Sequence, residues 1–230
     1  MKDVVRLVIS DLHLGSAYSK EDRLYELIAN VKCDELILAG DVIDFIKVPT
    51  FTKQTAALIH LIKSLDCRII YVIGNHDYVL RDFVGSTVDG IEFVEQYDFE
   101  YHGRKYRIEH GDRYEKGVVH WRFFMNMFSI AQDWIERTFK FNLAAFYVRN
   151  KKRKLKRIWD IVKWNDDVDV FVMGHTHKPE ALIWVDHNER IKTYVNTGDW
   201  VDHETYVIIK DGNIRLKNYE KAEDNYNEDG

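Results

Sequence analysis

The sequence predicts an α/β domain built around a parallel β-sheet. Residues 4–10, 35–40 and 68–74 are short apolar segments with the length and composition of buried strands. Residues 20–32 and 53–65, which separate them, carry apolar side chains at near-helical spacing. Strands that alternate with helices in this way are typical of βαβ units, in which neighbouring strands run parallel.

After residue 74 the predicted secondary structure changes to β-hairpins and then to a helical insertion. Residues 91–96, 98–103 and 105–111 resemble strands joined by tight turns, whereas 117–164 is aromatic, basic and helical in pattern. Residues 169–174 return to the buried-strand pattern, and four hairpin-like strands follow at 181–186, 190–196, 205–210 and 213–219. We expect one domain over 1–220 that includes the insertion 117–164, followed by a flexible tail at 221–230.

The composition fits a folded globular protein and excludes several classes. The 230 residues are 46% hydrophobic, include only 2 prolines and carry a net charge of −5, which argues against a uniformly basic nucleic-acid-binding protein. Cys33 and Cys67 form no Cys-x-x-Cys pair and no disulfide framework, so we expect a reducing, cytoplasmic setting. We see no signal-peptide pattern, and no apolar run approaches the roughly 18 residues of a membrane span.

Side chains that can bind metals follow five of the predicted strands. Any one of these short motifs could be a turn or a helix cap, but the carboxyl ends of strands in α/β sheets converge on one crevice. We therefore expect the five motifs to meet at one edge of the fold. They are Ser10-Asp11-Leu12-His13, Gly40-Asp41-Val42-Ile43-Asp44, Gly74-Asn75-His76-Asp77, His110-Gly111-Asp112 and Gly174-His175-Thr176-His177.

The types of ligand in these motifs indicate the class of metal. Carboxylate, amide and imidazole groups suit Mn, Fe, Zn or Mg, and the absence of a thiolate argues against a structural zinc site. There are more ligands than one ion needs. Two divalent ions that share a bridging carboxylate would account for the number.

The order of the motifs, D-x-H, G-D-x-x-D, G-N-H-D, H-G-D and G-H-T-H, resembles the calcineurin-like metallophosphoesterase superfamily from residue 9 to about 200. The resemblance implies a sandwich of two mixed β-sheets flanked by helices. It also implies that one ion is held by Asp11, His13 and His177, the other by Asn75, His110 and His175, and that Asp41 bridges them.

The same resemblance implies a hydrolytic mechanism for a phosphodiester or pyrophosphate bond. Two ions about 3.5–4 Å apart, most simply Mn²⁺, would clamp phosphate oxygens and hold a hydroxide for in-line attack. His76 would protonate the leaving-group oxygen, and Asp77 would orient His76. Asp44 and Asp112 are candidate acceptors that fix the tautomers of ligand histidines.

The insertion suggests what kind of substrate is recognised. Residues 121–136 place one narrow polar stripe on an otherwise apolar helix, and 149–157 contain seven basic residues in nine. The apolar helix could pack on the body of the protein, or it could form an acyl-chain groove or a membrane-facing lid. The basic segment could be a solvated helix face, or it could bind lipid headgroups, a nucleotide diphosphate or nucleic acid.

A narrower resemblance rests on SDLHL at 10–14, GDVIDF at 40–45, the insertion before GHTHKP at 174–179, and NTGDW at 196–200. These are similar to the UDP-2,3-diacylglucosamine pyrophosphatase branch, whose members cleave a lipid-linked UDP-sugar at the cytoplasmic membrane surface, commonly with manganese. His76 departs from that branch, where arginine is frequent at this position.

Two other functions remain open from the sequence. One is a soluble phosphodiesterase, nuclease or phosphoprotein phosphatase of the same fold, and the other is a non-catalytic binding module, which would usually have lost ligand histidines. If the protein is instead a lipid-nucleotide pyrophosphatase, as the narrower resemblance implies, we expect a cytoplasmic protein with peripheral contact to anionic membranes. The candidate substrate contacts are Arg81, Lys151, Arg153, Lys154, Asp199 and Trp200.

Overall fold

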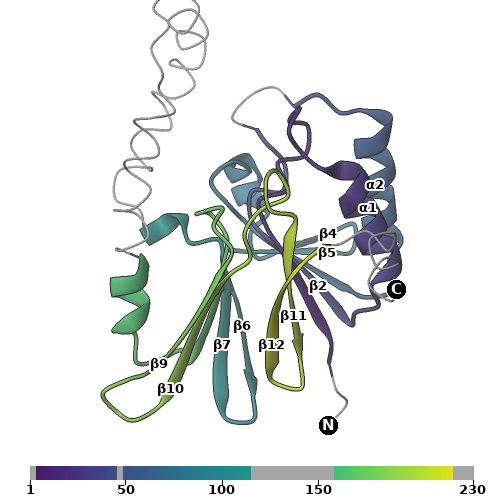
Figure 1. Cartoon of the computed structure of the whole chain (residues 1–230). Coiled ribbons are helices and arrows are strands. Elements are labelled where there is room, and N and C mark those ends of the chain that lie inside the picture. The colour runs from purple at the N-terminus through teal and green to yellow at the C-terminus, as the bar shows by residue number, and fades with distance from the viewer. Residues whose placement is uncertain (1–3, 46–48, 115–157, 220–230) are drawn as a thin grey trace, which may run out of the picture.

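The computed structural model describes residues 4–45, 49–114 and 158–219. Two β-sheets pack face to face at its centre (Figure 1). The first has seven strands in the order β12-β11-β1-β2-β3-β5-β4. Their bounds are β1 Arg6–Ile9, β2 Glu35–Ala39, β3 Arg68–Val72, β4 Thr87–Val88, β5 Ile91–Val94, β11 Thr205–Lys210 and β12 Asn213–Asn218.

The centre of this first sheet is parallel, as the sequence predicted. Leu36 of β2 lies opposite Leu7 of β1 on one side and Ile69 of β3 on the other. All five residues of β2 are buried because other layers cover both faces of the sheet, which explains its continuous apolar run. Strands β4, β11 and β12 join in antiparallel pairs, so the sheet is mixed.

The second sheet has five strands in the order β6-β7-β8-β10-β9. Strands β7, β8 and β10 run parallel to one another, whereas β6 and β9 pair antiparallel with β7 and β10 at the two edges. This sheet is also mixed, with bounds β6 Tyr97–Tyr101, β7 Arg104–Glu109, β8 Val170–Met173, β9 Glu180–Val185 and β10 Ile191–Asn196.

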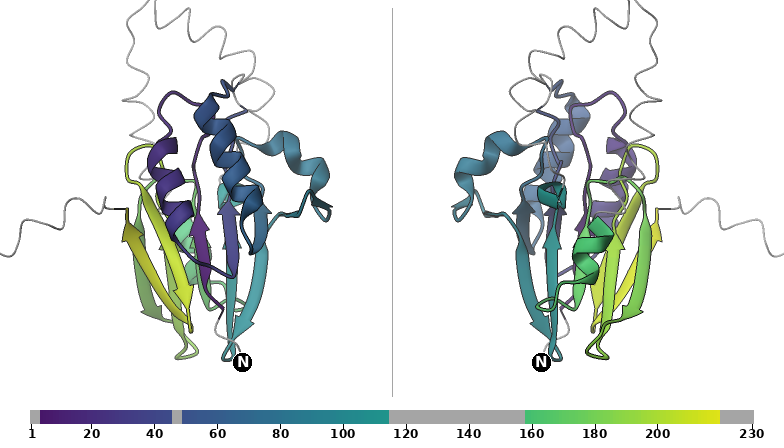
Figure 2. Two further views of the ribbon diagram at one scale, coloured as in Figure 1. Left: turned by 90° about the vertical axis from the view of Figure 1, so that its right-hand side faces the viewer. Right: turned by 90° about the vertical axis from the view of Figure 1, so that its left-hand side faces the viewer.

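Helices cover the outer faces of the two sheets (Figure 2). Helices α1 (Glu21–Asn30) and α2 (Lys53–Ser64) lie on the seven-stranded sheet, and the helical residues 158–163 lie on the five-stranded one. Thr52 caps α2 in a reciprocal capping box with Thr55, which satisfies backbone donors at the start of the helix. Two short 3₁₀ helices, η1 (Tyr78–Phe83) and η2 (Asp112–Tyr114), follow β3 and β7.

Three apolar clusters occupy the three spaces between these layers. Leu24 and Leu58 pack the helices onto the first sheet, Ile70 and Tyr106 lie between the sheets, and Ile158 packs the last helix on the second sheet. The expected sandwich of two mixed sheets flanked by helices is therefore confirmed. Of the predicted insertion 117–164, residues 117–157 lie outside the described residues, as does the predicted tail. In the described part of the chain, no helix has both the length and the apolar character to cross a membrane.

Candidate metal centre

The loops that carry the five motifs meet where the two sheets come together. β1, β2 and β3 of the first sheet deliver Asp11, Asp41 and Asn75, while β7 and β8 of the second sheet deliver His110 and His175. Backbone hydrogen bonds tie these loops to one another. The Asp11 N–H donates to Gly40 O at 3.0 Å, and the Gly174 N–H donates to His110 O at 3.2 Å. The site therefore spans both sheets, and the five motifs meet at one edge of the fold as the sequence predicted.

Most of the candidate ligand residues have a backbone conformation that L-amino acids rarely adopt. Asp11, His13, Asp41, His175 and His177 have φ values of 53°, 47°, 53°, 68° and 56°. A residue other than glycine pays about 1 kcal/mol or more for the left-handed region. Such strain persists only where the surroundings impose it, and it is concentrated at functional sites.

Two glycines let the ligand residues approach one another. Gly40 has φ +86°, and a Cβ placed there would lie 2.5 Å from Cγ of the His110 ring. A Cβ at Gly174 would overlap the carboxylate of Asp11 and the hydroxyl of Ser10. A larger residue at either position would push a ligand side chain out of the cluster.

The first group of ligand atoms combines Asp11, His13 and His177, whose candidate ligand atoms all lie within 4.8 Å of one another. His177 Nε2 lies 3.2 Å from Asp11 Oδ1 and 3.3 Å from His13 Nε2. Asp11 is fully buried, and its carboxylate also accepts hydrogen bonds from the His175 N–H and the Ser10 hydroxyl. These are the three residues expected to hold one ion.

The second group combines Asp41, His110 and His175 within the same 4.8 Å limit. His110 Nε2 lies 3.2 Å from Asp41 Oδ2 and 3.1 Å from Asn75 Oδ1. Asp41 and His110 are buried, whereas Asn75 and His175 are half-buried. The structure thus gathers the seven expected ligands into two adjacent groups with a buried floor and a partly open side.

His76 adjoins both groups. It forms a third potential ligand cluster with His13 and Asp41, and its Nε2 lies 3.7 Å from Asp41 Oδ2. Its Nδ1 lies 2.9 Å from Asp44 Oδ1. The contact with Asp44 fixes the ring so that Nε2 faces the centre.

The ring nitrogens on the far side of the ligand histidines also have partners. His110 Nδ1 lies 3.0 Å from the backbone oxygen of Ala39, and His177 Nδ1 lies 3.4 Å from Asp199 Oδ2. An Nδ1 that donates to oxygen leaves the Nε2 lone pair free to bind a cation. Both rings therefore present Nε2 to the centre in the tautomer that a metal requires.

The electrostatics of the centre favour a cation between the groups. Burial alone would raise the pKa of Asp41, but His110 beside it holds that pKa well below its usual range. Burial would likewise lower the pKa of His177, but Asp11 and Asp199 raise it to about 10. Ionised carboxylates thus face imidazoles that attract protons, and divalent cations can take the place of those protons. Buried oxygen and imidazole donors aimed at one another fit a divalent metal centre.

Asp77 does not have the expected role of orienting His76. Its buried carboxylate accepts hydrogen bonds from the Val42 N–H at 2.9 Å, the Gly74 N–H at 2.6 Å and the Tyr71 hydroxyl at 2.7 Å. Burial and the nearby Asp41 raise the pKa of Asp77 to about 6. Asp77 joins the loops after β2 and β3, and Asp44 is the residue that holds His76.

The expected substrate contacts are placed differently from one another. Trp200 is fully buried in the apolar cluster under α1, so it cannot touch substrate. Asp199 is also buried and holds His177 and His203, with His203 Nδ1 at 2.9 Å, so it supports a ligand histidine. Arg81 is exposed, pairs with Glu95 and lines a cavity of about 70 Å³ together with His110. Lys151, Arg153 and Lys154 lie outside the described residues.

Sequence reasoning missed several supporting residues around the ligands. The Ser10 hydroxyl donates a hydrogen bond to the Asp11 carboxylate and lies 2.5 Å from Thr197 Oγ1. Ser10 therefore links the Asp11 carboxylate to the residue that follows β10. Ala39 contributes only its backbone oxygen, so no side-chain signal could have identified it. His203 also contacts Asp199, and its position shortly after the NTGDW segment is the sequence signal that could have identified it.

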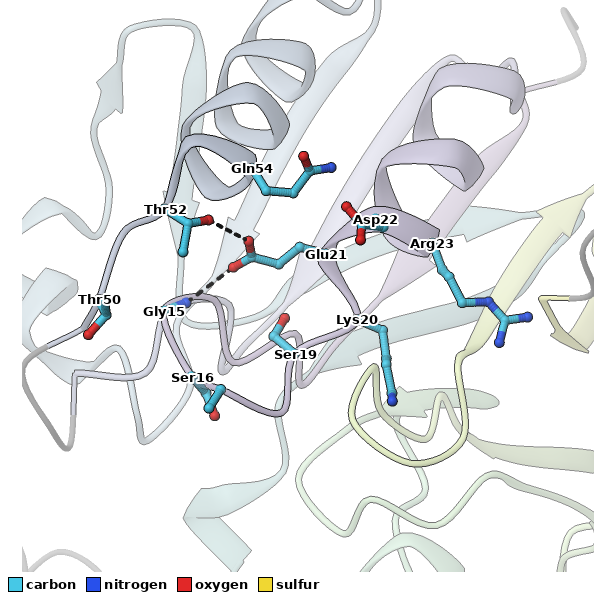
Figure 3. Close-up of a pocket in the computed structure, with 11 residues that line it drawn as sticks. Gly15, Ser16, Ser19, Lys20, Glu21, Asp22, Arg23, Thr50, Thr52 and Gln54 are labelled. Atoms are coloured by element: carbon cyan, nitrogen blue, oxygen red, sulfur yellow. Dashed lines mark hydrogen bonds between the residues drawn. The ribbon is translucent and has the colours of Figure 1, made fainter.

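A second cavity, of about 640 Å³, lies between the loops that precede α1 and α2 (Figure 3). The Glu21 carboxylate lies across it and accepts hydrogen bonds from the Gly15 N–H and the Thr52 hydroxyl, both at 3.4 Å. The lining is polar and includes no large apolar side chain: Gly15, Ser16, Ala17, Ser19, Lys20, Glu21, Asp22, Arg23, Thr50, Thr52 and Gln54. Such a cavity is unsuited to an acyl chain.

Comparisons with known proteins agree with the geometry. A family model described as calcineurin-like phosphoesterase matches residues 5–179. A UDP-2,3-diacylglucosamine hydrolase of Vibrio cholerae serotype O1 is 24% identical over 229 residues, covering 88% of this chain and 93% of that protein. The protein of the same name from Vibrio atlanticus is 24% identical over 243 residues, covering 92% and 96%.

Among solved structures, an archaeal phosphodiesterase is 16% identical with a TM-score of 0.47, covering 93% of this chain and 98% of that one. All seven candidate ligand residues, from Asp11 to His177, lie inside the segment that the family model matches. The chain therefore belongs to the calcineurin-like phosphoesterase family and is a metal-dependent hydrolase of phosphoester or pyrophosphate bonds.

Proposed function

We propose that the chain hydrolyses the pyrophosphate bond of a UDP-linked diacylglucosamine with two divalent cations bound in the metal centre. The observation that carries the proposal is the pair of adjacent ligand groups, Asp11–His13–His177 and Asp41–His110–His175. The relatives named UDP-2,3-diacylglucosamine hydrolase align with most of the chain, which supports this class of substrate.

The ligand assignment follows from which side chains face one another. Asp11, His13 and His177 would hold one cation, and Asn75, His110 and His175 would hold the other. Asp41 belongs to clusters with His110 and with His13, which supports a bridging role. When bound, two such cations stabilise the negative charge that develops on phosphoryl oxygens and lower the pKa of water. Oxygen and imidazole donors without thiolate suit Mn, Fe, Zn or Mg, and we propose Mn²⁺ because the branch that the sequence resembles commonly uses manganese.

His76 would supply a proton to the leaving-group oxygen. Its Nδ1 is held by Asp44, so Nε2 is the atom that faces the centre. Imidazole has an ordinary pKa near 6.5 and can give up a proton at neutral pH. Arg81, beside the small cavity next to His110, would lie within reach of a negatively charged part of the substrate.

The lipid part of the substrate would be bound by residues 117–157, which the structure does not describe. The large described cavity is lined by hydroxyl, amide and charged groups, so it supports no acyl-binding role. The basic segment that includes Lys151, Arg153 and Lys154 would contact anionic lipid headgroups. We accordingly propose that the protein works at the cytoplasmic surface of a membrane.

The experiment is a comparison of four substrates with the manganese-loaded protein. They are UDP-2,3-diacylglucosamine, UDP-N-acetylglucosamine as a control that lacks the two long acyl chains, bis(p-nitrophenyl) phosphate and p-nitrophenyl phosphate. We expect kcat/KM for the lipid-bearing substrate to exceed that for the control without long acyl chains by at least about 10²-fold, because the lipid then contributes binding energy to the transition state. Equal kcat/KM for these two UDP-sugars would refute the lipid assignment. Faster cleavage of the simple diester or monoester would instead identify a soluble phosphodiesterase or phosphatase.

A further inference from the structure

The two cysteines of the chain lie side by side although 34 residues separate them. Cys33 lies between α1 and β2, and Cys67 lies between α2 and β3. Their Sγ atoms are 4.0 Å apart. They are the only 2 cysteines in the sequence, so neither has a competing partner within the molecule.

The backbone around the cysteines holds the two loops together. β2 and β3 are parallel neighbours, with Glu35 opposite Arg68, and the Arg68 N–H donates to Asp34 O at 3.0 Å. Both cysteines lie in the short connections between a helix and the next strand. A disulfide requires sulfur atoms about 2.05 Å apart, which is a short movement from the observed separation.

The surroundings of the thiols favour reaction with a small oxidant. Both cysteines are half-buried, and the neighbouring Lys32, Asp66 and Arg68 are exposed, so the pair lies at the surface. The hydrogen bond from the Cys33 thiol lowers the pKa of Cys67, and the backbone amide of Leu36 acts in the same direction. Since the thiolate is the nucleophile, Cys67 is the residue suited to attack first.

We propose that Cys33 and Cys67 are a modification site that closes to an intramolecular disulfide by exchange with a low-molecular-weight disulfide such as oxidised glutathione. The Cys67 thiolate attacks a glutathione sulfur, forms a mixed disulfide and releases one glutathione thiolate. Cys33 then loses its proton to solvent and attacks the Cys67 sulfur, which releases the second glutathione thiolate. Two protein thiols are oxidised and one glutathione disulfide is reduced to two thiols, so the exchange balances.

The pair lies at the end of the sheet opposite to the metal centre. Cys33 and Cys67 precede β2 and β3, whereas the ligands Asp41 and Asn75 follow the same strands. β2 has five residues and spans about 16 Å at 3.3 Å per residue. The disulfide would therefore join the two βα units at their base without contacting a ligand.

The test is oxidation of the folded, metal-loaded full chain with oxidised glutathione, followed by alkylation with iodoacetamide and mass spectrometry. We expect a monomer lighter by two hydrogens, without alkylated cysteine, that yields a peptide pair linked through Cys33 and Cys67. Reduction with dithiothreitol should restore two alkylated cysteines. The matched variants Cys33→Ser and Cys67→Ser should each keep one cysteine that is alkylated or carries glutathione.

A second measurement checks that the fold brings the thiols together. Wild-type protein unfolded in guanidinium should close the bond at least about tenfold more slowly, because the chain must then close a long loop by diffusion. Three results would overturn the proposal: two alkylated cysteines after oxidation, two stable glutathione adducts, or a disulfide-linked dimer on a non-reducing gel. Equal closure rates for the folded and unfolded chains would also overturn it.

Discussion

The substitution Asp199→Asn should remove the hydrogen-bond acceptor of His177 while it keeps the oxygen that holds the local backbone. Asp199 Oδ1 accepts three backbone N–H bonds, from Val201 at 2.9 Å, Asp202 at 2.6 Å and His203 at 3.1 Å. Its Oδ2 faces His177 Nδ1 at 3.4 Å. Asparagine keeps an oxygen for the three backbone donors but presents an NH₂ group to His177. The NH₂ group cannot accept the Nδ1 proton, so the metal-binding tautomer loses its partner.

The distance limits how large the effect should be. Loss of an outer partner of a metal-bound histidine typically weakens metal binding by about 10–100-fold, or about 1.4–2.7 kcal/mol. The 3.4 Å separation is longer than an ordinary hydrogen bond, so we expect the value to lie near tenfold. Only the ion held by Asp11, His13 and His177 should be affected, because His177 is the ligand histidine that Asp199 holds.

The assay is calorimetric titration of the metal-free protein with Mn²⁺, with bound metal counted independently by mass spectrometry. Asp202→Asn is the matched control, since it removes the same charge from an exposed side chain three residues away. We expect one of two binding events to weaken in Asp199→Asn and neither to weaken in the control. Unchanged affinity in Asp199→Asn, or equal weakening in both variants, would refute the reasoning.

Three further outcomes are expected. His76→Ala should lower kcat by about 10²–10⁴-fold for substrates with poor leaving groups and less for nitrophenolate, with unchanged bound metal; the loss of one ion per chain would make His76 a ligand instead. Trp200→Ala should reduce the free energy of unfolding by about 3–5 kcal/mol in denaturant titration, because the side chain is fully buried; a raised KM at unchanged stability would contradict that placement. Replacing four basic residues with glutamine should abolish binding to anionic vesicles, since each contributes about 1 kcal/mol near such a surface; hydrolysis of a small diester should be unchanged, and normal vesicle binding would contradict the membrane role. These residues are Lys151, Lys152, Arg153 and Lys154.

The sequence by itself determined the elements of the core and the candidate ligands. Apolar runs such as 35–40 are local patterns, and a strand buried on both faces leaves that pattern wherever it lies in the fold. Glycine beside aspartate or histidine at the end of a strand is equally local. The seven candidate ligands were therefore recognisable from short motifs, and the structure places them in two adjacent groups.

Only the tertiary structure decided which residue supports which ligand. Asp77 adjoins His76 in sequence, yet its carboxylate turns inward to the amides of Val42 and Gly74, while Asp44 from another loop holds the imidazole. Trp200 lies next to a ligand-supporting aspartate but packs beneath α1. The direction of a side chain depends on packing between segments far apart in sequence, and local spacing carries no information about that packing. The 4.0 Å approach of Cys33 and Cys67 has the same origin, because it arises from the pairing of β2 with β3.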